Sequence, residues 1–349
     1  MTNDLDQKEN RVSEILQTNP LKWATVLISA CTMVLALVVP FSPLAERSSQ
    51  LEPANQEVQG GAQESSSPTI TLMNLEKPLS DTVLDTTDKI VILNTSELQQ
   101  RLAELKDTVE LTGVGGYAIS VDAEEAISAA LLSIEEQGNS VGFVMVDITT
   151  GRGVTYNSGE DFYSASSIKG IYCTGFAANY PDEVPMQEEA LYAMISYSDN
   201  DSYLWMRSFY GDEPLVLWCE AAGTESLGGD EWFPVCSPKT LTRLWLQNYL
   251  YFQSSSEISE QIATWYESTY NSALYNTLGN NYKVHSKGGW IADDDDGLYS
   301  TVDAGIVYAG ENGERPYLLV IMSDIPNDMT KLEPLVVALD AAHGDSWGE

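Results

Sequence analysis

Three short motifs in the second half of the chain carry residue types that can transfer an acyl group. They are Ser-Ser-Ile-Lys at residues 166–169, Ser-Asp-Asn at 198–200 and Lys-Gly-Gly at 287–289. A serine hydroxyl is a poor nucleophile until a neighbouring group takes its proton. Positions i and i+3 of a helix share a face, so Lys169 can lie one turn from Ser166. A lysine buried beside cations or apolar groups can be neutral and act as that base. The first motif therefore predicts a nucleophile at Ser166 and a general base at Lys169.

The elements that must position these motifs follow an order typical of a sheet with helices on its faces. In chain order we predict a helix at 122–137, strands at 141–148 and 154–157, a helical middle region, strands at 282–290, 300–309 and 317–323, and a helix at 331–342. This order predicts an α+β fold, in which an antiparallel five-stranded sheet is flanked by helices and carries an inserted helical subdomain.

With these motifs in this order, residues 120–349 resemble a penicillin-recognising serine hydrolase, closest to the class A β-lactamase-like family. Residues 162–169 resemble the segment that opens the family's central helix. Residues 194–200 resemble the helix and loop on the other wall of the cleft, and residues 284–290 the edge strand that lines it. The resemblance implies a serine hydrolase that forms an acyl-enzyme with a β-lactam or with a cell-wall peptide of the D-Ala-D-Ala type.

The resemblance also implies a role for each motif residue. Catalytic roles fall on Ser166, Lys169 and Ser198, and substrate-binding roles on Asn200, Lys287 and Gly289. Ser198 would pass a proton toward the leaving nitrogen, and Asn200 would contact the substrate amide or Lys169. Lys287 would attract the substrate carboxylate. Backbone amides at the start of the helix are suited to hold the developing oxyanion.

The sequence departs from the family's pattern in four places. Gly288 stands where the family has Thr or Ser, which removes a hydroxyl that would bind the substrate carboxylate. Residues 300–309 hold no Arg to assist Lys287, and residues 170–197 leave room only for a trimmed helical subdomain. The family's Glu-x-x-Leu-Asn loop, which activates the deacylating water, is not recognisable. Residues 224–238 contain Glu225 and Glu231, but neither has the flanking pattern.

The missing glutamate decides the expected mechanism. Without a carboxylate that activates water, we expect acylation followed by slow release, which is the behaviour of a penicillin-binding protein. Two other functions stay open at this point. They are a true β-lactamase that hydrolyses β-lactam antibiotics and a catalytically inactive cell-wall binding module.

The N-terminal region predicts a membrane anchor. Residues 23–41 carry no charge and are dominated by Val, Leu, Ile and Ala, which is long enough to span a bilayer as a helix. Lys8, Arg11 and Lys22 precede this run, so residues 1–22 are expected in the cytoplasm and the rest of the chain outside the cell. The alternatives are a cleaved signal peptide, although no Ala-x-Ala site follows, and lipidation at Cys31, although the apolar run continues past it.

Two further segments precede the hydrolase domain. Residues 42–69 are rich in Ser, Gln, Glu and Gly and are expected to form a flexible linker. Residues 70–119 are expected to form a stalk or a small packing extension. Within them, residues 88–93 are a candidate strand, and Asn94 or Thr95 can cap a helix that runs through Leu98, Leu102 and Leu105.

Composition excludes one class of partner. The chain has 17 basic and 52 acidic residues and a formal net charge of −35, so it repels phosphate backbones and is not expected to bind nucleic acid. No cluster of Cys and His has metal-binding spacing, so no cofactor or metal is predicted. The acidic run at 293–296 is expected to be a solvated hairpin loop, with a calcium site as the alternative. The sequence does not indicate an oligomeric state.

Structural roles are expected for the remaining cysteines and for one histidine. Cys173 follows the nucleophile on the same helix and is expected to be a packing thiol. Cys219 and Cys236 lie outside the membrane in the predicted topology, where an oxidising environment permits a disulfide. His285 is expected to pack on the edge strand, because the family's mechanism has no role for it.

Overall fold

The computed structural model describes residues 93–347 except 294 and 296. The predicted membrane helix, the linker and the first part of the extension therefore lie outside the described residues. Within the described part of the chain, no helix is both long and apolar enough to cross a bilayer.

A six-stranded antiparallel sheet organises the described residues, in the order β1-β3-β2-β8-β7-β6. The strands are β1 (Thr112–Val114), β2 (Val141–Asp147), β3 (Gly153–Tyr156), β6 (Lys283–Asp293), β7 (Leu298–Ala309) and β8 (Arg315–Ser323). The expectation of five strands was wrong, because β1 adds a sixth at the edge, with Gly113 opposite Val154. A strand of three residues is too short to show the alternation by which a strand is recognised in a sequence.

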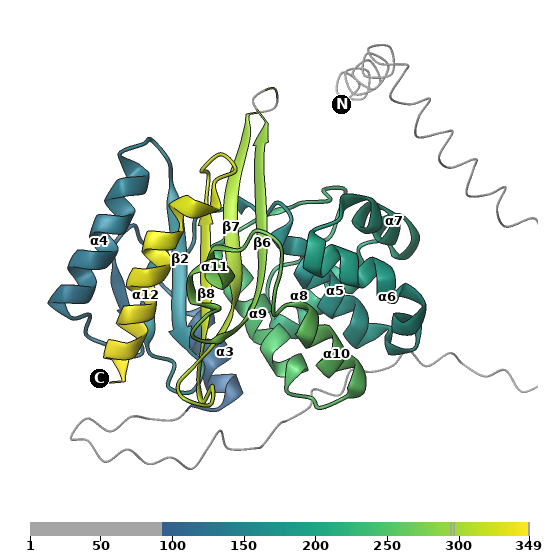
Figure 1. The fold of residues 1–349 in the computed structure, drawn as a ribbon, viewed down its shortest axis with the longest axis horizontal. Coiled ribbons are helices and arrows are strands. Elements are labelled where there is room, and N and C mark those ends of the chain that lie inside the picture. The colour runs from purple at the N-terminus through teal and green to yellow at the C-terminus, as the bar shows by residue number, and fades with distance from the viewer. Residues whose placement is uncertain (1–92, 294, 296, 348–349) are drawn as a thin grey trace, which may run out of the picture. The chain divides into compact units, whose positions relative to one another are not determined.

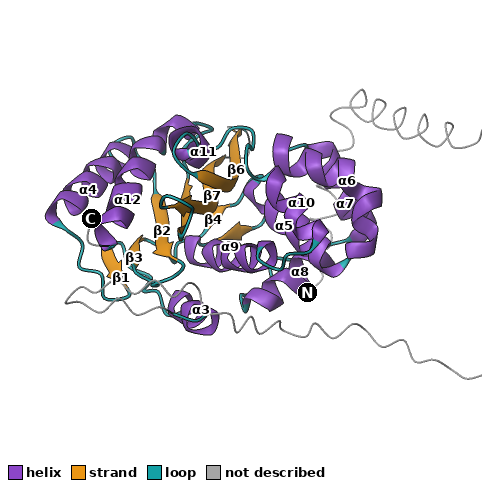
Figure 2. Cartoon of the chain, turned by 60° about the horizontal axis from the view of Figure 1, so that its bottom comes forward, coloured by secondary structure: helices purple, strands orange, loops and turns teal. Residues whose placement is uncertain are grey.

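Helices cover both faces of this sheet (Figures 1 and 2). On one face lie α4 (Val121–Glu135), α11 (Ala273–Leu278) and α12 (Glu333–Ser346), and on the other lie α5 (Ser167–Asn179) and α9 (Pro238–Phe252). Successive side chains of strand β2 point to opposite faces of the sheet, and both faces are covered by helices. Val144 and Val146 join the core on the α5 side, whereas Phe143 and Met145 join the core on the α4 side. Because both faces are buried, the strand reads as a continuous apolar run.

The inserted helical subdomain packs around α5. It contains α6 (Val184–Tyr192), a π-helical turn (Ala193–Tyr197), α7 (Asn200–Tyr210), α8 (Glu213–Ala222) and α10 (Glu257–Trp265). A second sheet of two short strands, β4 (Phe162–Tyr163) and β5 (Val235–Cys236), joins the segment before Ser166 to the end of the 224–236 loop. This pairing brings that loop beside the start of α5.

The described part of the N-terminal extension packs on the hydrolase domain. Helix α3 (Thr95–Ala103) begins with a capping box, in which Asn94 accepts a hydrogen bond from the Glu97 amide and the Glu97 side chain accepts one from the Asn94 amide. Leu98 and Leu102 are buried in the same core as α5 and α9. Residues 93–119 thus add one helix and one edge strand to the fold.

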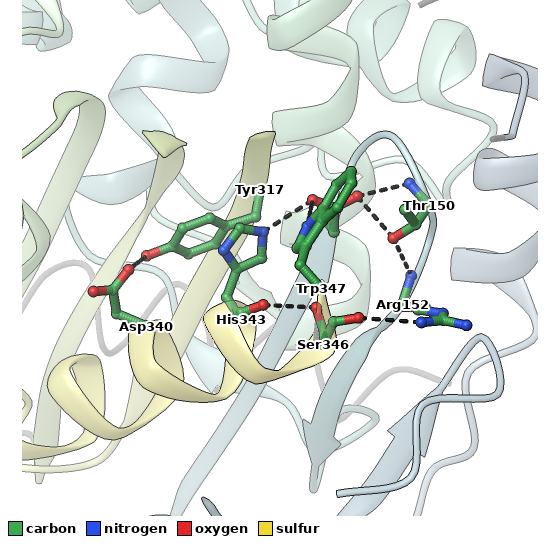
Figure 3. Close-up of polar contacts among 8 residues, drawn as sticks. Thr150, Arg152, Tyr317, Asp340, His343, Ser346 and Trp347 are labelled. Atoms are coloured by element: carbon green, nitrogen blue, oxygen red, sulfur yellow. Dashed lines mark hydrogen bonds and ion pairs between the residues drawn. The ribbon is translucent and has the colours of Figure 1, made fainter. Parts of the chain in front are cut away.

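The last helix is held to the sheet by a buried carboxylate (Figure 3). Asp147 accepts hydrogen bonds from the indole of Trp347 at 3.0 Å and from the amide of Thr150 at 2.6 Å, and it lies 2.9 Å from Nε2 of His343. Tyr317 stacks on the His343 ring with 4.2 Å between ring centroids. These contacts fix the C-terminal turn of α12 at the end of β2, on the opposite side of the sheet from α5.

Candidate active site

Ser166 lies at the N-terminus of α5, directly after a strained residue. Ala165 has a φ of +45°, which a residue with a Cβ rarely adopts, and such strain gathers at functional sites. Ser166 occupies the N-cap position, but its hydroxyl does not cap the helix. The Ser167 hydroxyl donates instead to the carbonyl of Ser164 at 2.7 Å. The half-buried Ser166 hydroxyl is therefore not engaged in holding the helix end.

Lys169 is buried one turn further along α5, as the sequence predicts, and points toward the second motif. Its Nζ donates to the carbonyl oxygen of Ser198 at 2.6 Å and to Oδ1 of Asn200 at 2.5 Å. Burial lowers the pKa of Lys169 to about 8, and the negative charge of Asp199 opposes this shift. A minor neutral fraction, about a tenth at pH 7, is thus available, and the neutral form is what a general base requires.

The conformation of Ser198 directs both its carbonyl oxygen and its hydroxyl toward lysine side chains. Ser198 follows the π-helical turn and has a φ of +62°. Asp199 then caps α7, because its Oδ1 accepts from the Ser202 amide at 2.7 Å. In this conformation the Ser198 carbonyl faces Lys169, and its hydroxyl accepts from Nζ of Lys287 at 3.0 Å. Ser198 therefore bridges the two lysines.

Lys287 reaches the same point from strand β6. It is fully buried and also donates to the carbonyl of Gly288 at 2.8 Å. Burial, and next the nearby charge of Lys169, lower the pKa of Lys287 to about 7, although Asp303 opposes the shift. The stem of Lys287 passes close to Gly170, where a Cβ would lie 3.1 Å from the Cβ of the lysine. A larger residue on this face of α5 would push the strand away.

Gly289 lets β6 touch the first turn of α5. A Cβ there would lie 2.5 Å from the amide nitrogen of Ser167 and 2.8 Å from that of Ser166. The Ser286 amide donates to the Tyr266 carbonyl, outside the sheet. Since an edge strand alternates the direction of its amides and the β6–β7 register is unbroken, the Trp290 N–H also points out of the sheet. The amides of Ser166 and Trp290 can thus form a pair of donors for an oxyanion.

The part of the site near Gly288 has neither a hydroxyl at position 288 nor an arginine on β7. Strand β7 contributes no arginine, and a Cβ at Gly288 would lie 2.5 Å from the carbonyl oxygen of Asn271. Asp303, opposite Gly288 in the sheet, is buried and accepts from the hydroxyl of Ser272 at 2.7 Å and the amide of Leu274 at 2.9 Å. Burial raises the pKa of Asp303 to about 6. Asp303 therefore anchors the loop that closes over Gly288.

An aromatic ring, absent from the sequence-based predictions, faces the catalytic lysine. Nζ of Lys169 lies 5.7 Å from the ring centroid of Phe233 and 5.8 Å from that of Tyr203. The loop that carries Phe233 is held by the Tyr203 hydroxyl, which donates to the Trp232 carbonyl at 2.6 Å, and by buried Arg207, which donates to the Gly229 carbonyl at 3.3 Å. No periodicity reveals this contact, because it joins residues far apart in the chain.

Two glutamates and a histidine were also considered from the sequence. Glu225 and Glu231 are exposed, and neither forms a hydrogen bond to Lys169. Burial lowers the pKa of His285 to about 3, and its ring packs between Phe252 and Tyr308, so it has a structural position.

The cysteines and the acidic hairpin show no cross-link or metal cluster in the described residues. Cys173, Cys219 and Cys236 are buried free thiols, so the permitted disulfide between the last two does not form in this structure. Residues 93–347, apart from 294 and 296, contain no group of three His, Cys, Asp or Glu side chains placed to hold a metal ion. Two positions of the acidic run at 293–296 lie outside the described residues.

The geometry brings all six predicted site residues together at the junction of α5, the 198–200 turn and β6. A profile of the Beta-lactamase enzyme family matches residues 175–339, which include the second and third motifs. The match begins after Ser166, but the structure joins Ser166 to both of those motifs through Lys169 and Gly289. The motifs, the fold and this match make the chain similar to the penicillin-recognising serine hydrolases, which work through an acyl-enzyme.

Solved structures of this hydrolase family share the fold at low sequence identity. PBP-A aligns with a TM-score of 0.52 and 16% identity, over 64% of this chain and 97% of its own. A β-lactamase from Streptomyces albus G aligns with a TM-score of 0.50 and 16% identity, over 62% of this chain and 98% of its own. A variant of PBP-A, solved as its acyl-enzyme complex with penicillin G, aligns with a TM-score of 0.51 and 17% identity, over 65% of this chain and 97% of its own. A search of curated protein sequences finds no significant match.

Proposed function

We propose that this serine hydrolase is acylated on Ser166 by a β-lactam or by a peptidoglycan substrate of the D-Ala-D-Ala type, and that the acyl group leaves slowly. The observation that carries the proposal is the surroundings of Lys169. Its Nζ donates hydrogen bonds to Ser198 and Asn200 and lies near the ring of Phe233, and among the described residues no carboxylate hydrogen-bonds to it. We therefore expect a base for the serine but no second base for water.

The acylation step is inferred from the positions of the motif residues on α5, the 198–200 turn and β6. Neutral Lys169 takes the proton of the Ser166 hydroxyl as Oγ attacks the carbonyl carbon of the donor. The amides of Ser166 and Trp290 hold the oxyanion that forms. The carbon–nitrogen bond then breaks, and the Ser198 hydroxyl gives its proton to the leaving nitrogen. Ser198 regains a proton from the ammonium of Lys287, which lies 3.0 Å from its Oγ.

Deacylation is the step that this site supports poorly. Water attacks the ester efficiently only when a positioned group removes its proton, which contributes typically 10²–10⁴-fold. The ring centroid of Phe233 lies 5.7 Å from Nζ of Lys169, and this side chain has no group that could take the proton of a water. The acyl-enzyme should therefore persist.

Burst kinetics test this proposal. With nitrocefin we expect a stoichiometric burst of product followed by very slow turnover. A true β-lactamase is the second candidate, favoured by the Beta-lactamase enzyme family profile that matches residues 175–339. Steady turnover near ten per second, about the median for enzymes, would make it the main function. A third candidate, an inactive cell-wall binding module, predicts no labelling by fluorescent penicillin.

The cellular arrangement is part of the proposal. We infer one membrane helix at 23–41, with the N-terminus in the cytoplasm and the catalytic domain outside the cell. The uncharged run and the basic residues that precede it support this orientation. An external catalytic domain would lie on the same side of the membrane as the cell wall.

A further inference from the structure

The connector, which comprises residues 266–272 between α10 and α11, contacts the segments that carry the first and second motifs. The hydroxyl of buried Tyr266 donates to the carbonyl oxygen of Gly170 at 2.6 Å, and Gly170 directly follows the lysine of the first motif. The Tyr270 amide donates at 2.8 Å to the carbonyl oxygen of Ser196, which lies on the π-helical turn before the second motif. The connector therefore joins α5 to the second motif.

A row of buried hydroxyls fastens the connector to β6 and β7 and ends on a carboxylate. The Ser272 hydroxyl donates to Oδ2 of Asp303 at 2.7 Å, so its oxygen can accept from the Ser286 hydroxyl at 2.8 Å. The Ser286 oxygen then accepts from the Thr269 hydroxyl at 3.3 Å. Because each hydroxyl has one proton to donate, the row runs in this direction when Asp303 acts as an acceptor. Two backbone amides, at 2.9 and 3.0 Å, also donate to that carboxylate.

This row of hydroxyls holds the backbone from which Lys287 extends. Ser286 directly precedes Lys287 on β6, and successive residues of a strand point to opposite faces of the sheet. Ser286 therefore binds the connector on one face, while Lys287 reaches the Ser198 hydroxyl at 3.0 Å on the other. A shift of the connector would move Ser198 through the second motif and Lys287 through β6. The connector thus sets the distance across which Lys287 returns a proton to Ser198.

Asp303 also acts on Lys287 through its charge. It lies on β7 opposite Gly288, the neighbour of Lys287 on β6. Burial, and next the positive charge of Lys169, lower the pKa of Lys287, and the negative charge of Asp303 opposes this shift. Cys173 also faces Lys287, but burial raises the pKa of its thiol, so it stays neutral. Asp303 therefore supports the charged form of the lysine, which is the form that can donate a proton.

We propose that Ser272 and Asp303 are positioning residues for the proton transfer to the leaving nitrogen. They align Lys287 and Ser198, which pass this proton, through the connector and through the charge of Asp303. This inference rests on the proposed acylation of Ser166 and specifies the step that the two residues support. Both side chains are buried beside α11, so they act through the residues around them and not by touching the acyl donor. Protonation of the leaving nitrogen should depend on them, whereas attack by Ser166 should not.

Two acyl donors with different leaving groups test this role. In penicillin G the carbon–nitrogen bond breaks and the nitrogen must gain a proton, whereas p-nitrophenyl acetate releases a stable phenolate that needs none. The measurement is the second-order rate of adduct formation at Ser166 of the full-length protein, by intact mass and peptide mapping. Ser272→Ala should slow acylation by penicillin G about tenfold or more, because a displacement of about 1 Å can cost about 10²-fold. It should slow acylation by the nitrophenyl ester less than about twofold, since no proton transfer to the leaving group contributes to that reaction.

Ser256→Ala is the matched control, because Ser256 caps α10 in the way that Ser272 caps α11. Both substitutions remove an N-cap and should destabilise the protein to a similar extent. Ser272 also bonds to Asp303, whereas Ser256→Ala should change neither rate by more than about twofold. Equal slowing of both donors by Ser272→Ala, or a slowing no greater than that of Ser256→Ala, would overturn the positioning role.

Asp303→Asn tests the charge in a side chain of nearly the same size. Burial lowers the pKa of Lys287 and the negative charge of Asp303 opposes this, so loss of that charge should leave less of the lysine charged at a given pH. The pH of maximal acylation by penicillin G should therefore move to a lower value. A variant that is slower at every pH but keeps the wild-type maximum would show a structural role alone and would overturn the assignment of Asp303. This test is independent of Ser272→Ala, so a failure of either variant to fold leaves the other decisive.

These outcomes separate the inference from the proposed function. If neither reagent labels Ser166 of the wild-type protein, the proposed acylation fails and the inference fails with it. If both label Ser166 but Ser272→Ala and Asp303→Asn behave as Ser256→Ala does, acylation stands and only the positioning role is wrong.

Discussion

The two buried lysines of the site hold their protons less tightly than lysines in water. Burial lowers the pKa of Lys169 to about 8 and that of Lys287 to about 7. A lysine that acts as a base works in its neutral form, and one that donates a proton works in its charged form. Acylation therefore requires neutral Lys169 and charged Lys287 at the same time. This requirement confines efficient acylation to a pH range near the two pKa values.

The rate of acylation should depend on pH through Lys169. Because neutral Lys169 is the base and charged Lys287 is the proton donor, the rate should reach a maximum between about pH 7 and about pH 8 and fall on either side. Asp199→Asn keeps an oxygen to cap α7 but removes the charge that raises the pKa of Lys169, so the maximum should move to lower pH. Rates of adduct formation by penicillin G between about pH 6 and about pH 10 locate both maxima. Maxima at the same pH, or a rate that keeps rising toward the ordinary pKa of lysine, would rule out this origin of the base.

At the scale of elements, the loop at 224–236 decides what happens after acylation. Its position depends on carbonyl contacts with Tyr203 and Arg207, and it brings Phe233 to Lys169. Phe233→Glu would place a carboxylate beside the acylated serine. We expect the lifetime of the acyl-enzyme to fall by tenfold or more, since a positioned base contributes 10²–10⁴-fold.

Phe233→Gln is the matched control for that substitution. Glutamine is close to glutamate in size and is also polar, but it cannot act as a base. Its acyl-enzyme should decay no faster than about twice the wild-type rate. Similar decay of the Glu and Gln variants, measured by mass after removal of free penicillin, would show that loss of the ring and not gain of a base is what matters.

Helix α3 is expected to be an integral part of the hydrolase domain. Leu102 is fully buried in the core shared with α9, so Leu102→Ala should lower the free energy of unfolding by about 2–5 kcal/mol. Gln100→Ala on the exposed face of the same helix should change it by less than about 0.5 kcal/mol. Urea denaturation of both variants measures this. A loss below about 1 kcal/mol for Leu102→Ala would mean that α3 folds apart from the domain.

The helices and strands also show how much of the fold can be predicted from the sequence. Helix α4 and strands β2, β7 and β8 were predicted within a few residues, because long apolar patterns reveal buried faces. The cap at Asn94 was one of two predicted options, and the structure selects it. Strand β1 was missed because three residues carry no pattern. The contact of Phe233 with Lys169 was missed because it depends on how distant loops close, which local spacing does not encode.

At the scale of the whole molecule, the proposed topology makes one clear prediction. If residues 23–41 span the membrane with the basic flank inside, protease added to intact cells should remove the domain at 120–349. A cytoplasmic control protein should stay intact, and an external one should be cut. Protection of the domain while the external control is degraded would show that the orientation is wrong.

A covalent bond at Ser166 is the central prediction for this protein. The decisive measurement is intact mass and peptide mapping of the full-length protein after incubation with penicillin G. We predict one adduct per chain, located on Ser166 and still present after free antibiotic is removed. It should be absent from Ser166→Ala and should form at least about 10²-fold more slowly in Lys169→Ala. An adduct on Ser164 or Ser167, no adduct on wild type, or an adduct lost within seconds would contradict the account.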